Sequence, residues 1–304
     1  MKVAFAGSPD AAVPVLRALA ASGHEVTLVV TQPQKARGRS GKLTPTPVGT
    51  AAEGLGLPVI APSSINHDEP LAALDAHGAR ALCVAAFGQI LRAPLLASRP
   101  CINVHYSLLP AYRGAAPVER AIMDGLTETG VTIMQMDAGL DTGPMISAER
   151  VAIGPEDDTG TLLARLGEVG GRLLVDAVDA LEAGTLTLTP QPDEGMSLAP
   201  KITDADRPLD PALSAETLAN RVRALSPHVG ATLEIDGERF KVWRTRARAE
   251  AAPGGITNDA GTLVVGCATG ALEILEIQPP SRGRMDAAAF LRGYRGPLEI
   301  SHRG

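Results

Sequence analysis

Short apolar runs alternate with longer amphipathic stretches through the first two thirds of the chain. The apolar runs predict strands at 2–6, 25–31, 80–85, 101–103, 130–136 and 145–151. Between them, apolar residues recur at helical spacing at 11–21, 46–54 and 117–124. A long helix is expected over 158–183, capped by Asp158 or Thr159 and ended by Gly184. Strands that alternate with helices predict an α/β fold with a Rossmann-like open, mostly parallel sheet.

The pattern changes after residue 188. Residues 189–211 hold five prolines and almost no periodicity, which is typical of a linker. A helix at 214–225 is then followed by short β-rich runs at 231–235, 239–247, 261–267 and 271–277. These runs predict a small OB-like β-barrel domain. We therefore expect a first domain over 1–188, a linker over 189–211 and a second domain over 212–304.

The composition is that of a folded protein with a substantial core. Of the 304 residues, 45% are hydrophobic and 20% are charged, which excludes a disordered or fibrous chain. No apolar run reaches the roughly 18 residues of a membrane span. The three cysteines lie far apart and predict neither a zinc site nor a disulfide framework. We expect a cytoplasmic protein with no membrane and no obligate protein partner.

A glycine turn, AGSPD, ends the first predicted strand. It lacks the further glycines of a dinucleotide fingerprint, so NAD binding is disfavoured. Gly7 still lies at the carboxyl edge of the sheet, where open α/β folds bind ligands.

The stretch CINVHYSLLPAYRGAAP, residues 101–117, contains the first candidate catalytic groups. Asn103 and His105 stand two apart at the end of a predicted strand, so their side chains leave the same face. An amide beside an imidazole can polarise a carbonyl and move a proton. A neutral histidine that merely caps a loop is an equal alternative on spacing alone.

A second loop, MQMDAGLDTGPM at 134–145, supplies two carboxylates between apolar strands. Gly139 and Gly143 allow the backbone to approach a ligand closely. A carboxylate placed there can raise the basicity of His105 and hold its tautomer. The alternative is a turn in which the aspartate bonds its own backbone. We favour that alternative for Asp137 and leave it open for Asp141.

Together these two loops resemble the folate-dependent formyltransferases, whose catalytic triad is Asn, His and Asp in these contexts. Further similar segments follow in the family's order: AFAGSPDAAVPVL, TQPQKARGRSGKLTPTPV, AFGQIL, KITDAD and RMDAAAFLRGYR. They are spread over almost the whole chain, and the resemblance narrows to the members that formylate methionyl-tRNA.

The resemblance implies specific roles. It assigns catalysis to Asn103, His105 and Asp141. It implies a folate site formed by Ser107, Leu108, Leu109, Pro110, Phe87, Gly88, Gln89 and Ile90. The implied formyl donor is 10-formyltetrahydrofolate, the acceptor is initiator methionyl-tRNA, and no metal is required. Three departures stand out: Tyr106 at a usually small position, Ala111 in place of an arginine, and SPHVGA at 226–231.

Local basic clusters are needed to hold a nucleic acid, because the overall charge is −6. One cluster suits a loop that reaches the acceptor stem: Lys35, Arg37, Arg39 and Lys42. A solvated surface loop is its alternative. The other lies on one face of a predicted strand, as a platform for phosphates: Arg244, Arg246 and Arg248, extended by Arg239 and Lys241. A charged edge strand is its alternative.

Several functional alternatives remain at this point. Formyl transfer to glycinamide ribonucleotide or an amino sugar would use the same triad. The first would normally need only one domain of about 200 residues. Water could also replace the amine, giving hydrolysis of the formyl-folate. A non-catalytic nucleic-acid-binding protein would leave the two catalytic-type loops unexplained.

Overall fold

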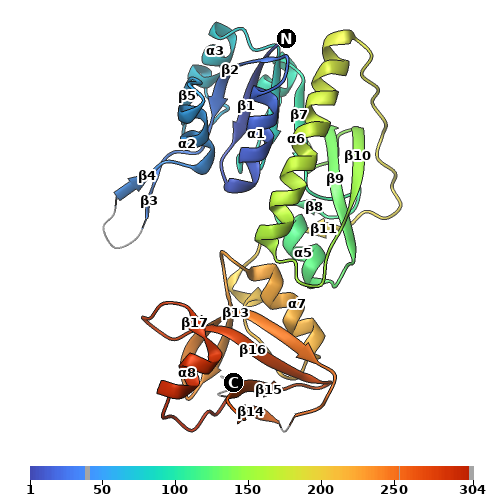
Figure 1. Cartoon of the computed structure of the whole chain (residues 1–304). Helices are drawn as coiled ribbons and strands as arrows, with labels where there is room; N and C mark the ends of the chain where they lie inside the picture. The colour runs from blue at the N-terminus through green and yellow to red at the C-terminus, as the bar shows by residue number, and fades with distance from the viewer. Residues whose placement is uncertain (38–41, 253, 301–304) are drawn as a thin grey trace. The chain divides into compact units, whose positions relative to one another are not determined.

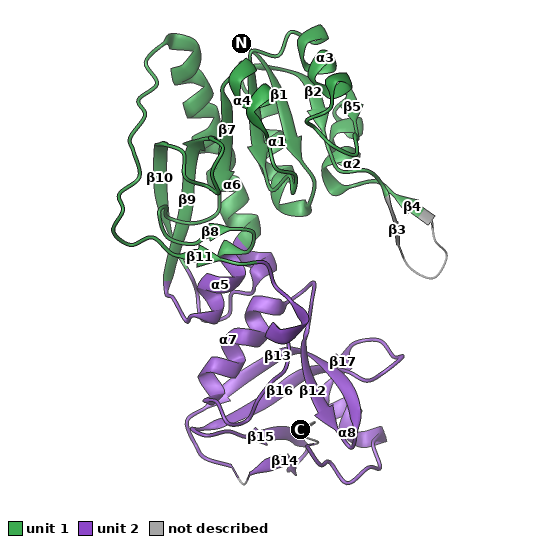
Figure 2. Ribbon diagram, turned by 180° about the vertical axis from the view of Figure 1, so that it is seen from behind, with its two compact units in different colours: residues 1–117, 128–152, 163–200 green, residues 118–127, 153–162, 201–304 purple. Residues whose placement is uncertain are grey.

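The computed structural model describes residues 1–37, 42–252 and 254–300 of the chain, which divides into two compact units (Figure 2). Unit 1 comprises Met1–Pro117, Glu128–Ala152 and Leu163–Pro200. Unit 2 comprises Val118–Thr127, Ile153–Leu162 and Lys201–Gly304.

Unit 1 is built on a seven-stranded sheet in the order β10-β9-β7-β6-β1-β2-β5 (Figure 1). The strands are β1 (Lys2–Gly7), β2 (Glu25–Val30), β5 (Val59–Ile60), β6 (Ala81–Ala85), β7 (Cys101–His105), β9 (Glu128–Gln135) and β10 (Met145–Ala152). The five strands from β7 to β5 pair in parallel, whereas β9 pairs antiparallel with both β7 and β10. The expected Rossmann-like, mostly parallel sheet is confirmed.

Helices cover both faces of this sheet. They are α1 (Val13–Ala20), α2 (Pro47–Gly54), α3 (Asp68–Ala76), α4 (Ala93–Ser98) and most of α6 (Thr159–Ala183). One face, with Ala4 and Leu82, packs against Leu74 of α3 and Leu95 of α4. No helix of the described residues is long and apolar enough to cross a membrane.

Helix α6 packs closely on the other face through its glycines. A Cβ atom on Gly170 would lie 2.5 Å from Cγ1 of Val104, and one on Gly171 would lie 2.8 Å from Cβ of Ala18. These positions therefore require glycine for the helix to approach β7 and α1. The helix begins as expected, because Oδ1 of Asp158 accepts a hydrogen bond from the backbone N–H of Thr161 at 2.8 Å.

Two short pairs of strands complete unit 1. β3 (Lys35–Arg37) and β4 (Lys42–Thr44) form an antiparallel hairpin within the expected basic loop. Arg39 of that cluster lies outside the described residues. β8 (Arg113–Gly114) pairs in parallel with β11 (Leu198–Ala199), so the proline-rich segment contributes a strand beside the stretch 101–117 that carries Asn103 and His105.

Unit 2 is a curled antiparallel sheet with two helices and most of a third, α5 (Pro117–Met123), consistent with the expected small β-barrel domain. Its strands follow the order β12-β13-β16-β15-β14, with β17 paired to β16. Its elements are α7 (Ala215–Leu225), β12 (Ala231–Ile235), β13 (Glu238–Arg248), β14 (Gly255–Asp259), β15 (Thr262–Gly266), β16 (Ala271–Gln278), β17 (Met285–Asp286) and α8 (Ala287–Gly293). The buried ring of Phe240 meets Phe290 edge-on, with 5.5 Å between centroids.

Candidate active site

Asn103 and His105 lie at the carboxyl end of β7, near the middle of the sheet. Both are nearly buried, with exposed fractions of 9% and 5%. β6 runs parallel beside β7, with Ala85 paired to Val104, so residues 87–90 emerge at the same edge of the sheet. The structure thus brings the amide and the imidazole to the ligand-binding edge of an α/β fold.

The tautomer of His105 is set by a backbone carbonyl. Its Nε2 lies 3.0 Å from the carbonyl oxygen of Tyr112. A carbonyl can only accept, so Nε2 carries the hydrogen and Nδ1 is left with its lone pair. Tyr112 is held at φ 59, a left-handed conformation that costs a non-glycine residue roughly 1–2 kcal/mol. This turn directs the carbonyl at the ring.

Asp141 reaches His105 from a loop that begins at the far end of β7. Because β9 runs antiparallel to β7, its last residue, Gln135, pairs with Ile102 near the start of β7. The loop that follows must therefore run back toward the end of β7 to bring Asp141 to His105. Asp141 is also left-handed, at φ 51. Its Oδ2 accepts a hydrogen bond from the N–H of Gly114 at 2.8 Å and lies 3.8 Å from Nδ1 of His105. The pair is close enough for strong electrostatic coupling but too far apart for a hydrogen bond.

Asp137 has the local role that the sequence favoured. Its Oδ1 accepts hydrogen bonds from the N–H of Gly139 at 3.0 Å and from the hydroxyl of Thr142 at 2.7 Å. This carboxylate stabilises its own turn, so Asp141 is the member of the pair that faces the imidazole.

The environment makes His105 a weaker base than an ordinary histidine. Burial lowers its pKa below the usual 6.5, and this effect outweighs the charge of Asp141 and the Tyr112 carbonyl, which both raise the pKa. Asp141 thus acts in the expected direction but does not dominate. At neutral pH the imidazole is uncharged and can accept a proton.

The residues expected around folate divide by accessibility. Phe87, Ser107 and Leu109 are buried, whereas Gly88 is exposed and 79% of the Ile90 surface is accessible. The Ser107 hydroxyl donates to the carbonyl of Ala111 at 2.6 Å. Gln89 is engaged with the backbone of residues 62–65. Leu108 and Pro110 are half-buried.

Two structural contacts explain positions that the sequence left open. The hydroxyl of Tyr106 donates to the carbonyl of Ala11 at 2.8 Å, and burial raises the pKa of this phenol. Tyr106 therefore belongs to the core. Thr132 was missed altogether: its hydroxyl donates to the carbonyl of Ser107 and accepts from the N–H of Leu109, which fixes the turn after His105.

Comparisons with known proteins identify the family. The model described as "Formyl transferase" matches residues 1–178, and "Formyl transferase, C-terminal domain" matches residues 201–295. The chain belongs to the formyltransferase family. A relative named methionyl-tRNA formyltransferase, from Methylobacterium sp. (strain 4-46), is 47% identical over 97% of each chain. Another of that name, from Aromatoleum aromaticum, is 45% identical over 100% of this chain and 96% of its own.

Solved structures show the same fold. An N-formyltransferase from Helicobacter canadensis, in complex with folinic acid and dTDP-3-aminofucose, has a TM-score of 0.67 at 16% identity, covering 92% of this chain and 99% of its own. A phosphoribosylglycinamide formyltransferase from Bacillus halodurans has a TM-score of 0.50 at 27% identity, covering 60% of this chain and 95% of its own.

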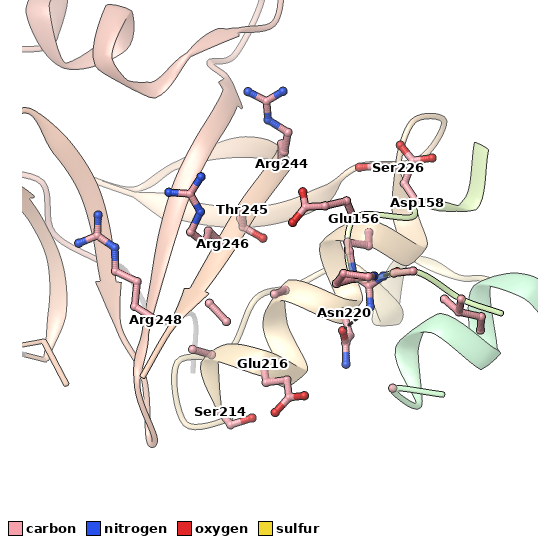
Figure 3. Close-up of a pocket in the computed structure, with 18 of the residues that line it drawn as sticks. Glu156, Asp158, Ser214, Glu216, Asn220, Ser226, Arg244, Thr245, Arg246 and Arg248 are labelled. Carbon is pink, nitrogen blue, oxygen red and sulfur yellow. Dashed lines mark hydrogen bonds between the residues drawn. The ribbon is translucent and has the colours of Figure 1, made fainter. Parts of the chain in front are cut away.

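The expected arginine face lies beside a cavity of about 900 Å³ within unit 2 (Figure 3). Arg244, Arg246 and Arg248 follow one another along β13 there. Glu273 accepts from Nη1 of Arg246 at 3.4 Å and from Nε of Arg248 at 3.1 Å, which offsets part of their charge. β13 pairs with β16 over Lys241–Arg248 but with β12 only over Glu238–Val242, so in the described sheet the part that carries the three arginines is paired on one side, and the alternative of a charged edge strand stays open.

A second group of cations lies around Trp243 in unit 2, and of its members the sequence singled out only Lys241. The guanidinium carbon of Arg284 lies 3.4 Å from the ring centroid, and Nζ of Lys241 lies 5.2 Å from it. Burial and the neighbouring charges of Arg207 and Arg284 lower the pKa of Lys241. The three side chains donate to the carbonyls of Gly230, Val229 and Pro227 within the SPHVGA run. We call Arg207, Lys241 and Arg284 the Trp243 cluster.

Proposed function

We propose that this chain transfers the formyl group of 10-formyltetrahydrofolate to the amino group of initiator methionyl-tRNA. The product would be N-formylmethionyl-tRNA, used in translation initiation in the cytoplasm. The observation that carries the proposal is the end-to-end likeness to the methionyl-tRNA formyltransferases, 47% identical over 97% of each chain. The glycinamide ribonucleotide enzyme covers only 60% of this chain. A small acceptor of that kind would leave unit 2 without a role.

The triad can perform the transfer in two steps. The neutral amine attacks the formyl carbon, and His105, uncharged at neutral pH, receives the proton that the amine loses. The oxyanion that forms is stabilised by the N–H of the Asn103 amide and by the new imidazolium, and each such donor contributes about 3–4 kcal/mol. His105 then gives its proton to the departing folate nitrogen.

Asp141 stabilises the charged intermediate state of His105. Its carboxylate is 3.8 Å from Nδ1, the nitrogen that lacks a hydrogen in the free protein. As Nδ1 gains a proton, the carboxylate faces a positive charge. The attraction is therefore largest when the imidazolium exists, which is the requirement for catalysis.

The residues at the end of β6 fit a planar, partly apolar donor. Gly88, held at φ 80, presents accessible backbone, and Ile90 presents an exposed apolar side chain. Both follow the strand next to β7, at the edge where His105 lies. We propose that this edge binds the folate, with residues 107–110 forming the wall opposite residues 87–90.

For the tRNA, we propose a division of labour between the basic groups. The first domain, residues 1–188, holds folate and triad, and the loop with Lys35, Arg37, Arg39 and Lys42 approaches the acceptor stem. The second domain, residues 212–304, contacts phosphates. There Lys241, Arg284 and Arg244 are better placed than Arg246 and Arg248, because Glu273 already binds the latter two. Arg207 is likewise paired, with Asp204 at 3.0 Å.

Binding of charged initiator tRNA at increasing salt tests this proposal. A tRNA substrate requires affinity that falls steeply with salt, since counterions leave each contacted phosphate. Replacing Lys241 or Arg284 by Met should reduce the slope of log K against log salt by about 1. Arg172→Met, an exposed arginine on α6 paired with Glu149, is the control and should leave the slope unchanged. Salt-independent binding would contradict a tRNA acceptor.

A further inference from the structure

The glutamine at position 191 lies beside the two catalytic-type loops, although the sequence places it in a linker. The chain enters this region by pairing Thr189 with Met145, the first residue of β10, through two backbone hydrogen bonds of 2.8 Å. It leaves by pairing β11 with β8. Gln191, half-buried, is held between these two attachments within unit 1.

All four hydrogen-bonding positions of the Gln191 amide are used. Its Oε1 accepts from Nε and Nη2 of Arg113, at 3.0 and 2.6 Å. Its Nε2 donates to the carbonyls of Asp141 and Gly143, both at 2.8 Å. Arginine can only donate and a carbonyl can only accept, so the amide has one possible orientation.

These bonds join the two loops that determine the surroundings of His105. Tyr112, Arg113 and Gly114 are consecutive, and each contacts the site: Tyr112 through its carbonyl to His105, Gly114 through its N–H to Asp141, and Arg113 through its side chain to Gln191. On the other loop, Gln191 holds the carbonyls of Asp141 and Gly143, on both sides of Thr142. It thereby restrains a residue whose φ is left-handed.

We propose that Gln191 is a positioning residue for formyl transfer, which fixes the carboxylate of Asp141 against the ring of His105. This inference rests on the catalytic roles proposed above for those two residues. Gln191 touches neither of the reacting groups. It acts through the backbone of the loop that carries Asp141 and through Arg113.

The position of Asp141 has a measurable consequence at His105. Asp141 is the ionised group whose charge raises the pKa of this ring, against the larger opposite effect of burial. Without Gln191, the carbonyls of Asp141 and Gly143 lose this partner, and the Asp141 carboxylate, which keeps its bond to the N–H of Gly114, can move away from the ring. The pKa of His105 should then fall further below 6.5. Loss of a stabilising contact elsewhere would not change the pKa of His105.

The experiment compares Gln191→Met, Asp141→Asn, the double variant and a control, Thr189→Val. Thr189 lies two residues away with an exposed side chain that has no hydrogen bond within the described part of the chain. Turnover, KM for the folate donor and the pKa of His105 by NMR of labelled histidine are measured for each. Thermal melting shows that each protein is folded.

We expect Gln191→Met to lower kcat by about 10²-fold, as a misplaced catalytic group does, with KM for folate nearly unchanged. It should also lower the pKa of His105, as Asp141→Asn does. In the double variant, the two changes should not add, because both remove the same interaction. Gln191→Glu, which keeps an acceptor for Arg113 but loses both N–H donors, should show a similar loss of kcat while remaining folded.

Two outcomes distinguish a failure of the positioning role from a failure of the proposed catalytic roles. If Asp141→Asn impairs turnover but Gln191→Met leaves kcat and the pKa of His105 unchanged, or if their effects simply add, the positioning role is wrong. If Asp141→Asn itself leaves turnover near normal, the proposed catalytic roles are wrong, and the inference about Gln191 is wrong with them.

Discussion

The charge of Asp141 provides the sharpest test of the mechanism. Asp141→Asn is nearly isosteric, and the new amide oxygen can still accept the hydrogen bond from Gly114. The loop should therefore stay in place while its charge is lost. Two unit charges 3.8 Å apart attract by roughly 4 kcal/mol at an effective dielectric constant of about 20. This attraction operates only while His105 is protonated.

A loss of that size corresponds to about 10³-fold in rate. Solvent and relaxation will recover part of it, so we expect turnover to fall at least ~10²-fold, with folate binding largely kept. Single-turnover formylation of methionyl-tRNA, measured between pH 5 and 8, gives both the turnover and the apparent affinity for folate. Because the proposed mechanism requires neutral His105, the pH–rate profile of the native protein should fall on its acid side with an apparent pKa below 6.5. In the variant this apparent pKa should shift lower still, since a contribution that raises the pKa is removed. Near-normal turnover, or an apparent pKa that moves upward, would refute the reasoning.

Three further substitutions test the framework of the site. Tyr106→Phe should destabilise the protein by about 1–3 kcal/mol in urea unfolding, because the carbonyl of Ala11 loses its buried partner. Asp206→Asn should cost roughly 1–2 kcal/mol, since Arg120 holds the pKa of Asp206 down to about 2. The native protein should accordingly lose this contribution as the pH falls from about 4 to 2, and the variant should not. Gly143→Ala should reduce turnover by at least ~10-fold, because its Cβ would collide with the β9 backbone and displace the loop; unchanged kinetics would show that the loop tolerates the shift.

Periodicity predicted six of the seven strands of the main sheet and its long helix, but missed the two-residue strand β5. Strands such as β1 and β6 are short apolar runs between turn residues, and α6 has both an N-cap at Asp158 and a glycine after its end. The short α3 and α4 were missed. Each spans at most nine residues and buries only one or two side chains, so the apolar spacing is too brief to detect.

The candidate site was predictable where its residues are neighbours in sequence. Asn103 and His105 share a strand end, and alternation alone places them together. Asp141 is different, because β9 is antiparallel and its loop begins far from His105. The sequence favoured a local role for Asp137 but left Asp141 open, and only the resemblance to a known family assigned Asp141 to catalysis. Gln191 gave no signal, since it lies in a proline-rich segment whose contacts are made by tertiary structure.

The basicity that the sequence predicted for His105 differs from what the structure shows. A carboxylate next to a histidine suggests a raised basicity, yet burial of His105 lowers its pKa overall. Sequence spacing conveys which charges are near, but not how much water is excluded. In the mechanism proposed above, the imidazole is therefore neutral before the reaction and becomes charged when it takes the proton that the amine loses.

Formyl transfer from 10-formyltetrahydrofolate, measured in parallel with initiator methionyl-tRNA, glycinamide ribonucleotide and water as acceptors, tests the central claim most directly. We expect rapid formylation of the tRNA alone. Transfer only to the small amine, or only hydrolysis, would contradict it, while leaving the folate edge and the triad to be explained by another acceptor.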